Sequence, residues 1–207
     1  MTEDPLEEIR WGREPVPVVA VVGFSNVGKT TLIEQLVSRL GTRGLVVGAV
    51  KHTSHGFTAD RPGKDSDRIY RAGASAVTLV SRDQMATFKR RQPEQPSLGQ
   101  ALREMPSYLD LVLAEGFAWE PVPRLVLVRN GEAPASRHTE AGPVLAVIEV
   151  PEREEGYPPR FGADVLNALI KQLMDRVSAV AMSNGSKANV ARNSRTPISL
   201  EIVKEGT

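Results

Sequence analysis

The chain has 207 residues, 41% of them apolar and 25% charged, which suits one large domain with short tails. Its 26 basic and 25 acidic residues nearly cancel, so no global field attracts nucleic acid or an anionic membrane. The absence of cysteine excludes disulfide scaffolds, thiolate metal sites and cysteine nucleophiles. No apolar run reaches the roughly 18 residues of a membrane span, and the acidic start lacks the apolar core of a signal peptide. We therefore expect a cytoplasmic globular protein with neither nucleic acid nor membrane as a partner.

Three segments of the chain differ in character. Residues 1–14 are charged and indicate an N-terminal extension. Residues 15–177 alternate short apolar runs with helical patterns, as expected of one α/β domain. Residues 178–207 form a polar tail, in which only PISLEIV (197–203) alternates like an edge strand.

The middle segment predicts strands and helices in alternation. The β-branched run at 16–23 is typical of a strand buried on both faces, and residues 28–40 place leucines four apart, as on an amphipathic helix. Such alternation favours parallel pairing through crossovers, so we expect a mostly parallel central sheet flanked by helices. Further strands are expected at 45–51 (also buried), 109–116, 124–129 and 144–150, helices at 64–74, 97–105 and 161–177, and a small β-hairpin extension from 76–81 and 84–89.

The first strand leads into GFSNVGKTT (23–31), which matches the phosphate-loop pattern G-x-x-x-x-G-K-[ST]. Backbone N–H groups that lead into a helix N-terminus offer fixed positive dipoles to a polyphosphate. We expect Lys29 to reach the β- and γ-phosphates, and so to act in catalysis, and the Thr30 hydroxyl to bind Mg²⁺. The pattern predicts a P-loop NTPase whose nucleotide contacts come from Gly23, Ser25, Asn26, Val27, Gly28, Lys29, Thr30 and Thr31.

A magnesium site also needs a carboxylate, and Glu115 ends a predicted buried strand. Parallel strands bring their carboxyl ends to the edge that holds the phosphate loop, so Glu115 is the predicted catalytic and metal-binding acid. Asp110 starts the same strand and is expected to be structural. Asp60 and Asp65 follow the second strand and are candidates to face the nucleotide, Asp65 also as a metal ligand. For Asp65 the alternative is a role in the first turn of a helix.

His52 and His55 lie three residues apart in KHTSHGF. They can make ordinary loop hydrogen bonds, recognise an anion or another ligand together with Lys51, or take part in a transition-metal site. The basic run of residues 89–91 is expected to be a solvated loop.

The segments GFSNVGKTTL (23–32), KHTSHGFTADRPGKDSDRIYRAGA (51–74) and DLVLAEGF (110–117) resemble the MobB family of molybdopterin-guanine dinucleotide biosynthesis adaptors, over residues 16–175. The resemblance implies GTP binding with slow Mg²⁺-dependent hydrolysis, a homodimer, and a MobA-like nucleotidyltransferase partner that attaches GMP to the molybdopterin cofactor. It also implies a loop near the nucleotide or pterin ligand that contains His52, His55, Asp60, Lys64, Asp65 and Arg68.

Two features depart from related patterns. Ala118 follows EGF where the family often has lysine, and the guanine-recognition tetrapeptide N-K-x-D is absent from the sequence. Guanine preference is therefore implied by the resemblance alone, with Arg129 and Asn130 as candidates to contact the base. The alternatives are a P-loop kinase for a small metabolite and, because of His52 and His55, a metal-insertion GTPase. Arg68 or Arg71 could act as an arginine finger.

Overall fold

The computed structural model describes residues 16–58, 60–90, 97–150 and 158–183. The chain divides into two units, and each is described by itself. Residues up to Lys51 and from Ser97 onward form the sheet unit, and residues 52–96 form the hairpin unit. The expected N-terminal extension, most of the expected polar tail and its candidate edge strand lie outside the described residues.

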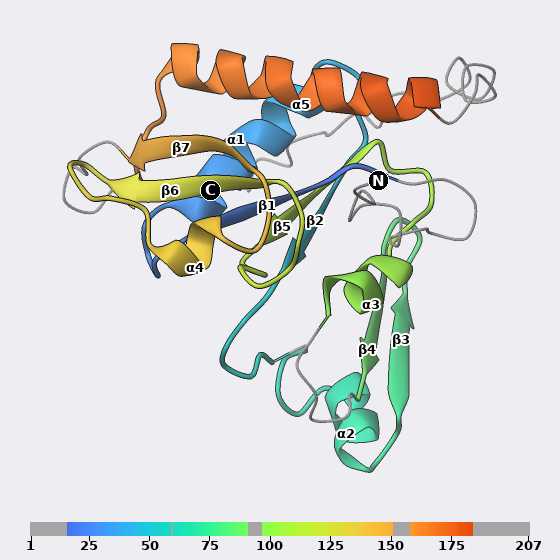
Figure 1. The fold of residues 1–207 in the computed structure, drawn as a ribbon. Coiled ribbons are helices and arrows are strands. Elements are labelled where there is room, and N and C mark those ends of the chain that lie inside the picture. Colours follow the sequence, from blue (N-terminus) through green and yellow to red (C-terminus); the bar gives the residue numbers. More distant parts are fainter. Residues whose placement is uncertain (1–15, 59, 91–96, 151–157, 184–207) are drawn as a thin grey trace, which may run out of the picture. The chain divides into compact units, whose positions relative to one another are not determined.

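A five-stranded parallel sheet forms the centre of the sheet unit (Figure 1). The strands follow the order β2-β5-β1-β6-β7. Strand β1 (Val18–Gly23) lies in the middle, between β5 (Leu111–Glu115) and β6 (Arg124–Arg129). The outer strands are β2 (Val47–Lys51) and β7 (Val144–Val150). The predicted mostly parallel sheet is confirmed, while the strand order was beyond what the sequence pattern could supply.

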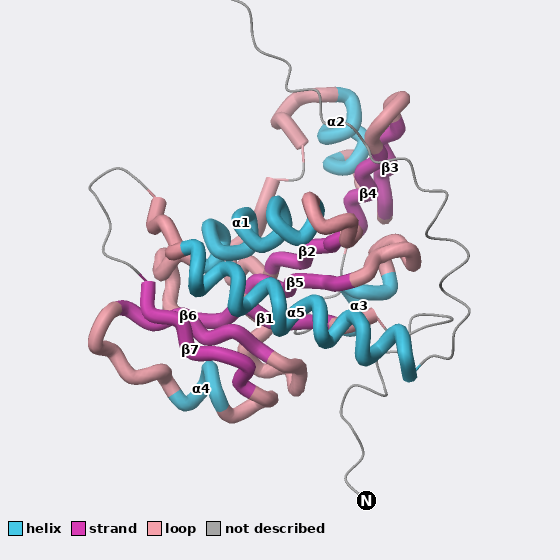
Figure 2. Tube along the Cα trace, turned by 90° about the horizontal axis from the view of Figure 1, so that it is seen from above, coloured by secondary structure: helices cyan, strands magenta, loops and turns pink. Residues whose placement is uncertain are grey.

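Helices cover both faces of this sheet. Figure 2 shows α1 and α5 side by side on one face, where they contact each other. On the opposite face lie α3 and the short α4. The bounds are Lys29–Gly41 for α1, Leu98–Arg103 for α3, Ser136–Thr139 for α4 and Ala163–Ser183 for α5. Among the helices in the described part of the chain, none has the length and apolar character to span a membrane.

The two faces of β1 bury two separate apolar cores. Val19 and Val21 belong to the core under α1 and α5, whereas Val18, Ala20 and Val22 belong to the core under α3. Successive side chains of a strand point to opposite faces, so an unbroken apolar run is what a doubly covered central strand needs. The strand predicted at 16–23 is confirmed, with the buried faces that its composition indicated.

Three details differ from the expected pattern or add to it. Strand β2 is an edge strand in which only Gly48 is buried, so the prediction of a buried strand at 45–51 was wrong in this respect. Helix α5 continues to Ser183, past the expected helix end at Val177. Asp110 has the structural contact expected of it, because its Oδ2 accepts the Val46 N–H at 2.8 Å and joins the starts of β5 and β2.

The hairpin unit contains one short helix and two antiparallel strands. Helix α2 (Asp65–Arg71) precedes β3 (Ala76–Val80) and β4 (Met85–Lys89), which pair in register from Ala76↔Lys89 to Val80↔Met85. The predicted β-hairpin is confirmed. Of the described residues between 52 and 96, none is buried. The described residues of this unit therefore supply no buried core, and a hairpin of two strands has little stability without a covering surface.

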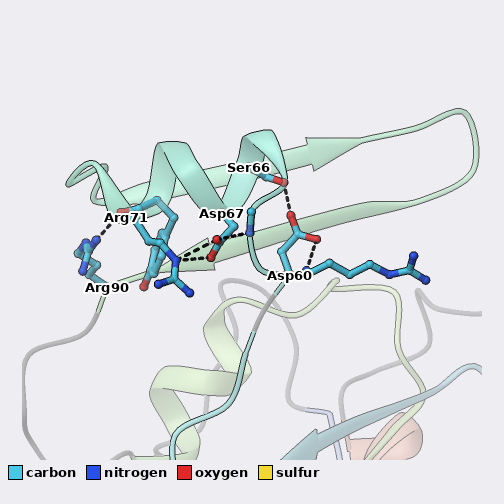
Figure 3. Close-up of polar contacts among 8 residues, drawn as sticks. Asp60, Ser66, Asp67, Arg71 and Arg90 are labelled. Atoms are coloured by element: carbon cyan, nitrogen blue, oxygen red, sulfur yellow. Dashed lines mark hydrogen bonds and ion pairs between the residues drawn. The ribbon is translucent and has the colours of Figure 1, made fainter.

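Polar contacts hold α2 against its flanking segments (Figure 3). The Asp67 carboxylate accepts the Gly63 N–H at 2.8 Å and the Arg71 Nε–H at 2.9 Å. The Gly63 hydrogen bond and then Arg71 hold the pKa of Asp67 below its usual range. At the other end, Arg90 donates to the carbonyls of Tyr70 and Ala74 and stacks 4.4 Å from the Tyr70 ring centroid. Arg90 therefore anchors the helix end from an exposed position just after β4, in keeping with the solvated loop expected there.

Candidate nucleotide-binding site

The loop between β1 and α1 has the backbone conformation that its glycines permit. Gly23 has φ +148° and Gly28 has φ +112°, values that residues with a Cβ rarely adopt. A Cβ on Gly23 would lie 2.6 Å from the carbonyl oxygen of Leu127, so β6 leaves no room for a larger residue. Asn26 is also left-handed, with φ 58°. The neighbouring strand and three positive-φ residues thus fix the shape of the loop.

The Lys29 side chain lies against this loop. Its Nζ donates to the carbonyl oxygens of Phe24 at 2.7 Å and Gly23 at 3.1 Å. Burial lowers the pKa of Lys29; the charge of Glu115 opposes this and the charge of Lys51 adds to it. Lys29 is therefore a partly desolvated ammonium group, held on the curve of the loop by two carbonyls that phosphate oxygens can replace as acceptors.

Thr30 and Glu115 meet beside the loop. The Thr30 hydroxyl donates to Glu115 Oε2 at 2.8 Å, although 85 positions separate the two residues in the sequence. The fold brings them together because Glu115 ends β5, where it is the register partner of Val21 in β1. Gly116 and Phe117 follow with φ 89° and 54°, so the chain turns away sharply just after the carboxylate. The structure therefore places the predicted strand-end acid next to the predicted metal-binding hydroxyl.

The donors present suit the ligands of a nucleotide site. A threonine hydroxyl and a carboxylate are hard oxygen donors, which Mg²⁺ prefers. Helix α1 begins at Lys29, and its N-cap residue, Gly28, has no side chain to cap the helix; the first turn contains no acidic residue. A helix N-terminus of this kind favours an anion. The site residues thus fit a polyphosphate with a magnesium ion at Thr30 and Glu115.

A further cluster at the loop was not predicted from the sequence. Helix α4 brings the His138 ring to 5.3 Å from the Phe24 ring, edge to face, and the Arg137 guanidinium to 4.8 Å from the same ring. Burial, and then the positive charges of Arg137, Lys29 and Arg124, lower the pKa of His138 below its usual range. The lowered pKa favours the neutral imidazole, whose Nε2 accepts the Arg137 Nε–H at 3.3 Å. The polar sequence around α4 has no apolar period that could have indicated a helix.

The remaining candidate residues lie in the hairpin unit. Asp60 accepts the Arg61 N–H at 2.6 Å and the Ser66 hydroxyl, so it shapes its own loop (Figure 3). Asp65 begins α2, the alternative considered for it, and pairs with Arg68 at 3.7 Å while its side chain is 96% exposed. His52 is half-buried and His55 exposed. Within the described residues, no three His, Asp or Glu side chains gather as a metal cluster.

The parallel sheet, the phosphate loop after its central strand and the acid on the adjacent strand define a P-loop nucleotide-binding fold. The sequence profile described as "MobB: Molybdopterin guanine dinucleotide synthesis protein B" matches residues 18–150. The chain belongs to the MobB family. The resemblance found in the sequence is thereby confirmed.

Similar proteins carry the same description. The molybdopterin-guanine dinucleotide biosynthesis adapter protein of Escherichia coli (strain K12) is 39% identical over 123 residues, which are 58% of this chain and 70% of the relative. The protein of that name from Haemophilus influenzae is 38% identical over 116 residues, or 56% of this chain and 65% of the relative.

Solved structures give the same result for the fold. A crystal structure of molybdopterin-guanine biosynthesis protein B (mobB) matches with a TM-score of 0.60 and 31% identity, covering 78% of this chain and 99% of that one. A MobB protein homolog from Bacillus stearothermophilus matches with a TM-score of 0.55 and 30% identity, covering 78% and 98%.

Proposed function

We propose that this protein is a GTP-binding adaptor with slow Mg²⁺-dependent GTPase activity in the biosynthesis of molybdopterin guanine dinucleotide. The observation that carries the proposal is the convergence of Lys29, Thr30 and Glu115 on one phosphate loop. The names of the family and of its relatives supply the pathway. The proposal keeps the cytoplasm as the site of action, since a GTP-dependent protein needs the nucleotide pool of that compartment.

The residues divide the chemistry among them. Lys29 stabilises the charge of the transferred phosphoryl group, and the loop amides orient the phosphates. Thr30 and Glu115 would hold a magnesium ion, which neutralises phosphate charge when bound. Both arginines suggested as an arginine finger pair with acids of their own helix, Arg71 with Asp67 and Arg68 with Asp65. A site without a dedicated activating group is consistent with slow hydrolysis.

Nucleotide selectivity gives the direct test of this proposal. We expect calorimetry with Mg²⁺ to show GTP bound at least about tenfold more tightly than ATP, a difference of about 1.4 kcal/mol. Omission of Mg²⁺ should weaken binding of GTP more than that of GDP, because a bound ion would neutralise phosphate charge, of which GTP carries more.

The rival functions give different results in the same experiments. Equal affinity for both nucleotides, or preference for ATP, would contradict the adaptor proposal. Phosphoryl transfer to a small acceptor instead of water would favour the kinase. Stoichiometric nickel binding that is lost when His52 and His55 are both replaced by alanine would favour the metal-insertion GTPase.

The proposal includes two partners: a MobA-like nucleotidyltransferase with its molybdopterin cofactor, and a second copy of this chain. Support for the homodimer comes from the hairpin unit. Val80 and Met85 face each other across β3 and β4 and are 75% and 74% exposed, while Phe57 is 77% exposed. Large apolar side chains with this exposure, on a unit without a core, favour burial against another protein surface.

A paired substitution tests the homodimer. Val80→Lys with Met85→Glu keeps a favourable cross-strand pair and removes the apolar surface, so we expect the dimer to dissociate at least about tenfold more readily. Analytical ultracentrifugation measures this change. The control is Val165→Lys with Met182→Glu, two exposed apolar positions of α5, which should leave self-association unchanged. A monomeric wild-type protein, or equal effects of both pairs, would contradict this interface.

A further inference from the structure

The ammonium group of Lys51 contacts both residues of the proposed magnesium site, Thr30 and Glu115. Its Nζ lies 3.1 Å from Glu115 Oε1 and 3.2 Å from the Thr30 hydroxyl oxygen. The same hydroxyl donates to the other carboxylate oxygen, Oε2, at 2.8 Å. One ammonium group, one carboxylate and one hydroxyl therefore form a closed set of three contacts.

The fold fixes this arrangement. Lys51 is the last residue of β2 and Glu115 the last of β5, and the two are register partners in adjacent parallel strands. The Glu115 side chain is only 12% exposed, whereas that of Lys51 is 58% exposed. The ammonium group thus caps a largely buried carboxylate from the solvent side. A buried carboxylate without a counter-charge is costly, so Lys51 compensates a charge that the site keeps ready for a metal.

An ammonium group and a divalent cation cannot share these oxygens. Mg²⁺ binds oxygen ligands at about 2.0–2.1 Å and demands a near-octahedral shell that includes several water molecules. The Lys51 nitrogen already lies about 3 Å from the carboxylate and the hydroxyl that would hold the ion, and its positive charge would repel a divalent cation bound there. The three residues can hold the ammonium group or the metal, but not both.

We propose that Lys51 is the resident counter-ion of the metal site, which holds Glu115 and Thr30 in place until nucleotide arrives and must leave before a divalent cation binds. This inference rests on the proposed function of Thr30 and Glu115. Lys51 therefore lowers the affinity of the nucleotide-free protein for divalent metal. Phosphate oxygens offer the ammonium group another acceptor, so the nucleotide and the metal bind together.

Binding of Mn²⁺ to the nucleotide-free protein tests the proposal. Mn²⁺ is a paramagnetic substitute for Mg²⁺, and its free concentration is measured by electron paramagnetic resonance. We expect Lys51→Met to bind Mn²⁺ at least about tenfold more tightly than the wild type, because a charge next to the metal position is removed. Lys51→Arg keeps the charge and should bind as weakly as the wild type.

Two controls separate the local effect from others. Lys171→Met removes the same charge from an exposed position on α5 and should leave Mn²⁺ affinity unchanged. In a Glu115→Gln background, Lys51→Met should no longer tighten Mn²⁺ binding, since the carboxylate on which both cations depend is gone. Unchanged or weaker Mn²⁺ binding by Lys51→Met in the wild-type background would overturn the proposal.

Failure of the Lys51 proposal can be told apart from failure of the proposed GTP-binding function. Wild-type protein that binds GTP with Mg²⁺, combined with no effect of Lys51→Met, leaves the GTP-binding function standing and removes only the counter-ion role. Wild-type protein that fails to bind GTP removes the proposed function, whatever the Mn²⁺ measurement gives.

Discussion

Replacing Lys29 with alanine should weaken GTP binding by at least about 100-fold, or about 2.7 kcal/mol. The ammonium group is partly desolvated and lies on the curve of the phosphate loop, where its charge is worth more than in water. Isothermal titration calorimetry with GTP and Mg²⁺ measures the change directly. Lys29→Ala should leave the fold intact, because β1 is held by its backbone pairing with β5 and β6.

A matched variant and a stability measurement complete this test. Lys171→Ala removes an equal charge from the exposed face of α5 and should bind GTP as the wild type does. Far-ultraviolet circular dichroism and thermal unfolding check that Lys29→Ala is folded. GTP affinity retained by a folded Lys29→Ala protein would exclude the loop as the phosphate site.

Replacing Arg124 with methionine should destabilise the protein by about 3 kcal/mol. Arg124 is fully buried at the start of β6 and donates to the carbonyl oxygens of Ala118 at 2.8 Å and of Glu120. Burial lowers the pKa of Arg124. Methionine fills similar volume, so the expected loss comes from carbonyls left without donors rather than from a cavity. Urea denaturation measures the free energy of unfolding.

Arg129, at the other end of the same strand, is the control. It pairs with Glu132 at 3.8 Å, and its side chain is 57% exposed. Solvent screens such a pair, so Arg129→Met should change the free energy of unfolding by less than about 0.5 kcal/mol. Equal losses from the two arginines would show that the carbonyl contacts of Arg124 contribute little.

The sequence pattern predicts which segments form strands, but it does not predict where each strand lies in the sheet. The run at 16–23 and the run at 45–51 are both rich in valine, yet the first became the central strand and the second an edge strand. The apolar content of a strand indicates that its side chains pack against other parts of the protein, but it does not indicate which strand lies next to it. Strand order depends on contacts between distant segments, such as the insertion of β5 between β1 and β2.

The site was predictable to the extent that it follows from local motifs and sheet polarity. Lys29 and Thr30 belong to one motif, and Glu115 could be placed beside them because the carboxyl ends of parallel strands meet at one edge. The sequence places Lys51 only beside the nearby histidines, because its contact with Glu115 depends on the pairing of β2 with β5, which the sequence does not predict. Arg137 belongs to a helix of four residues, which is too short to show a helical period in the sequence.

The strand order has a consequence for synthesis on the ribosome. Strands β1 and β2 emerge first, but they are not neighbours, because β5 lies between them and is made only after the hairpin unit. Lys51 and Thr30 lack their shared partner until Glu115 of β5 has been made, and β1 lacks its second neighbour until β6 has been made. A nascent chain that ends before these strands therefore carries the phosphate-loop motif without its folded form. Competence to bind nucleotide arises late, through contacts of large sequence separation that form slowly.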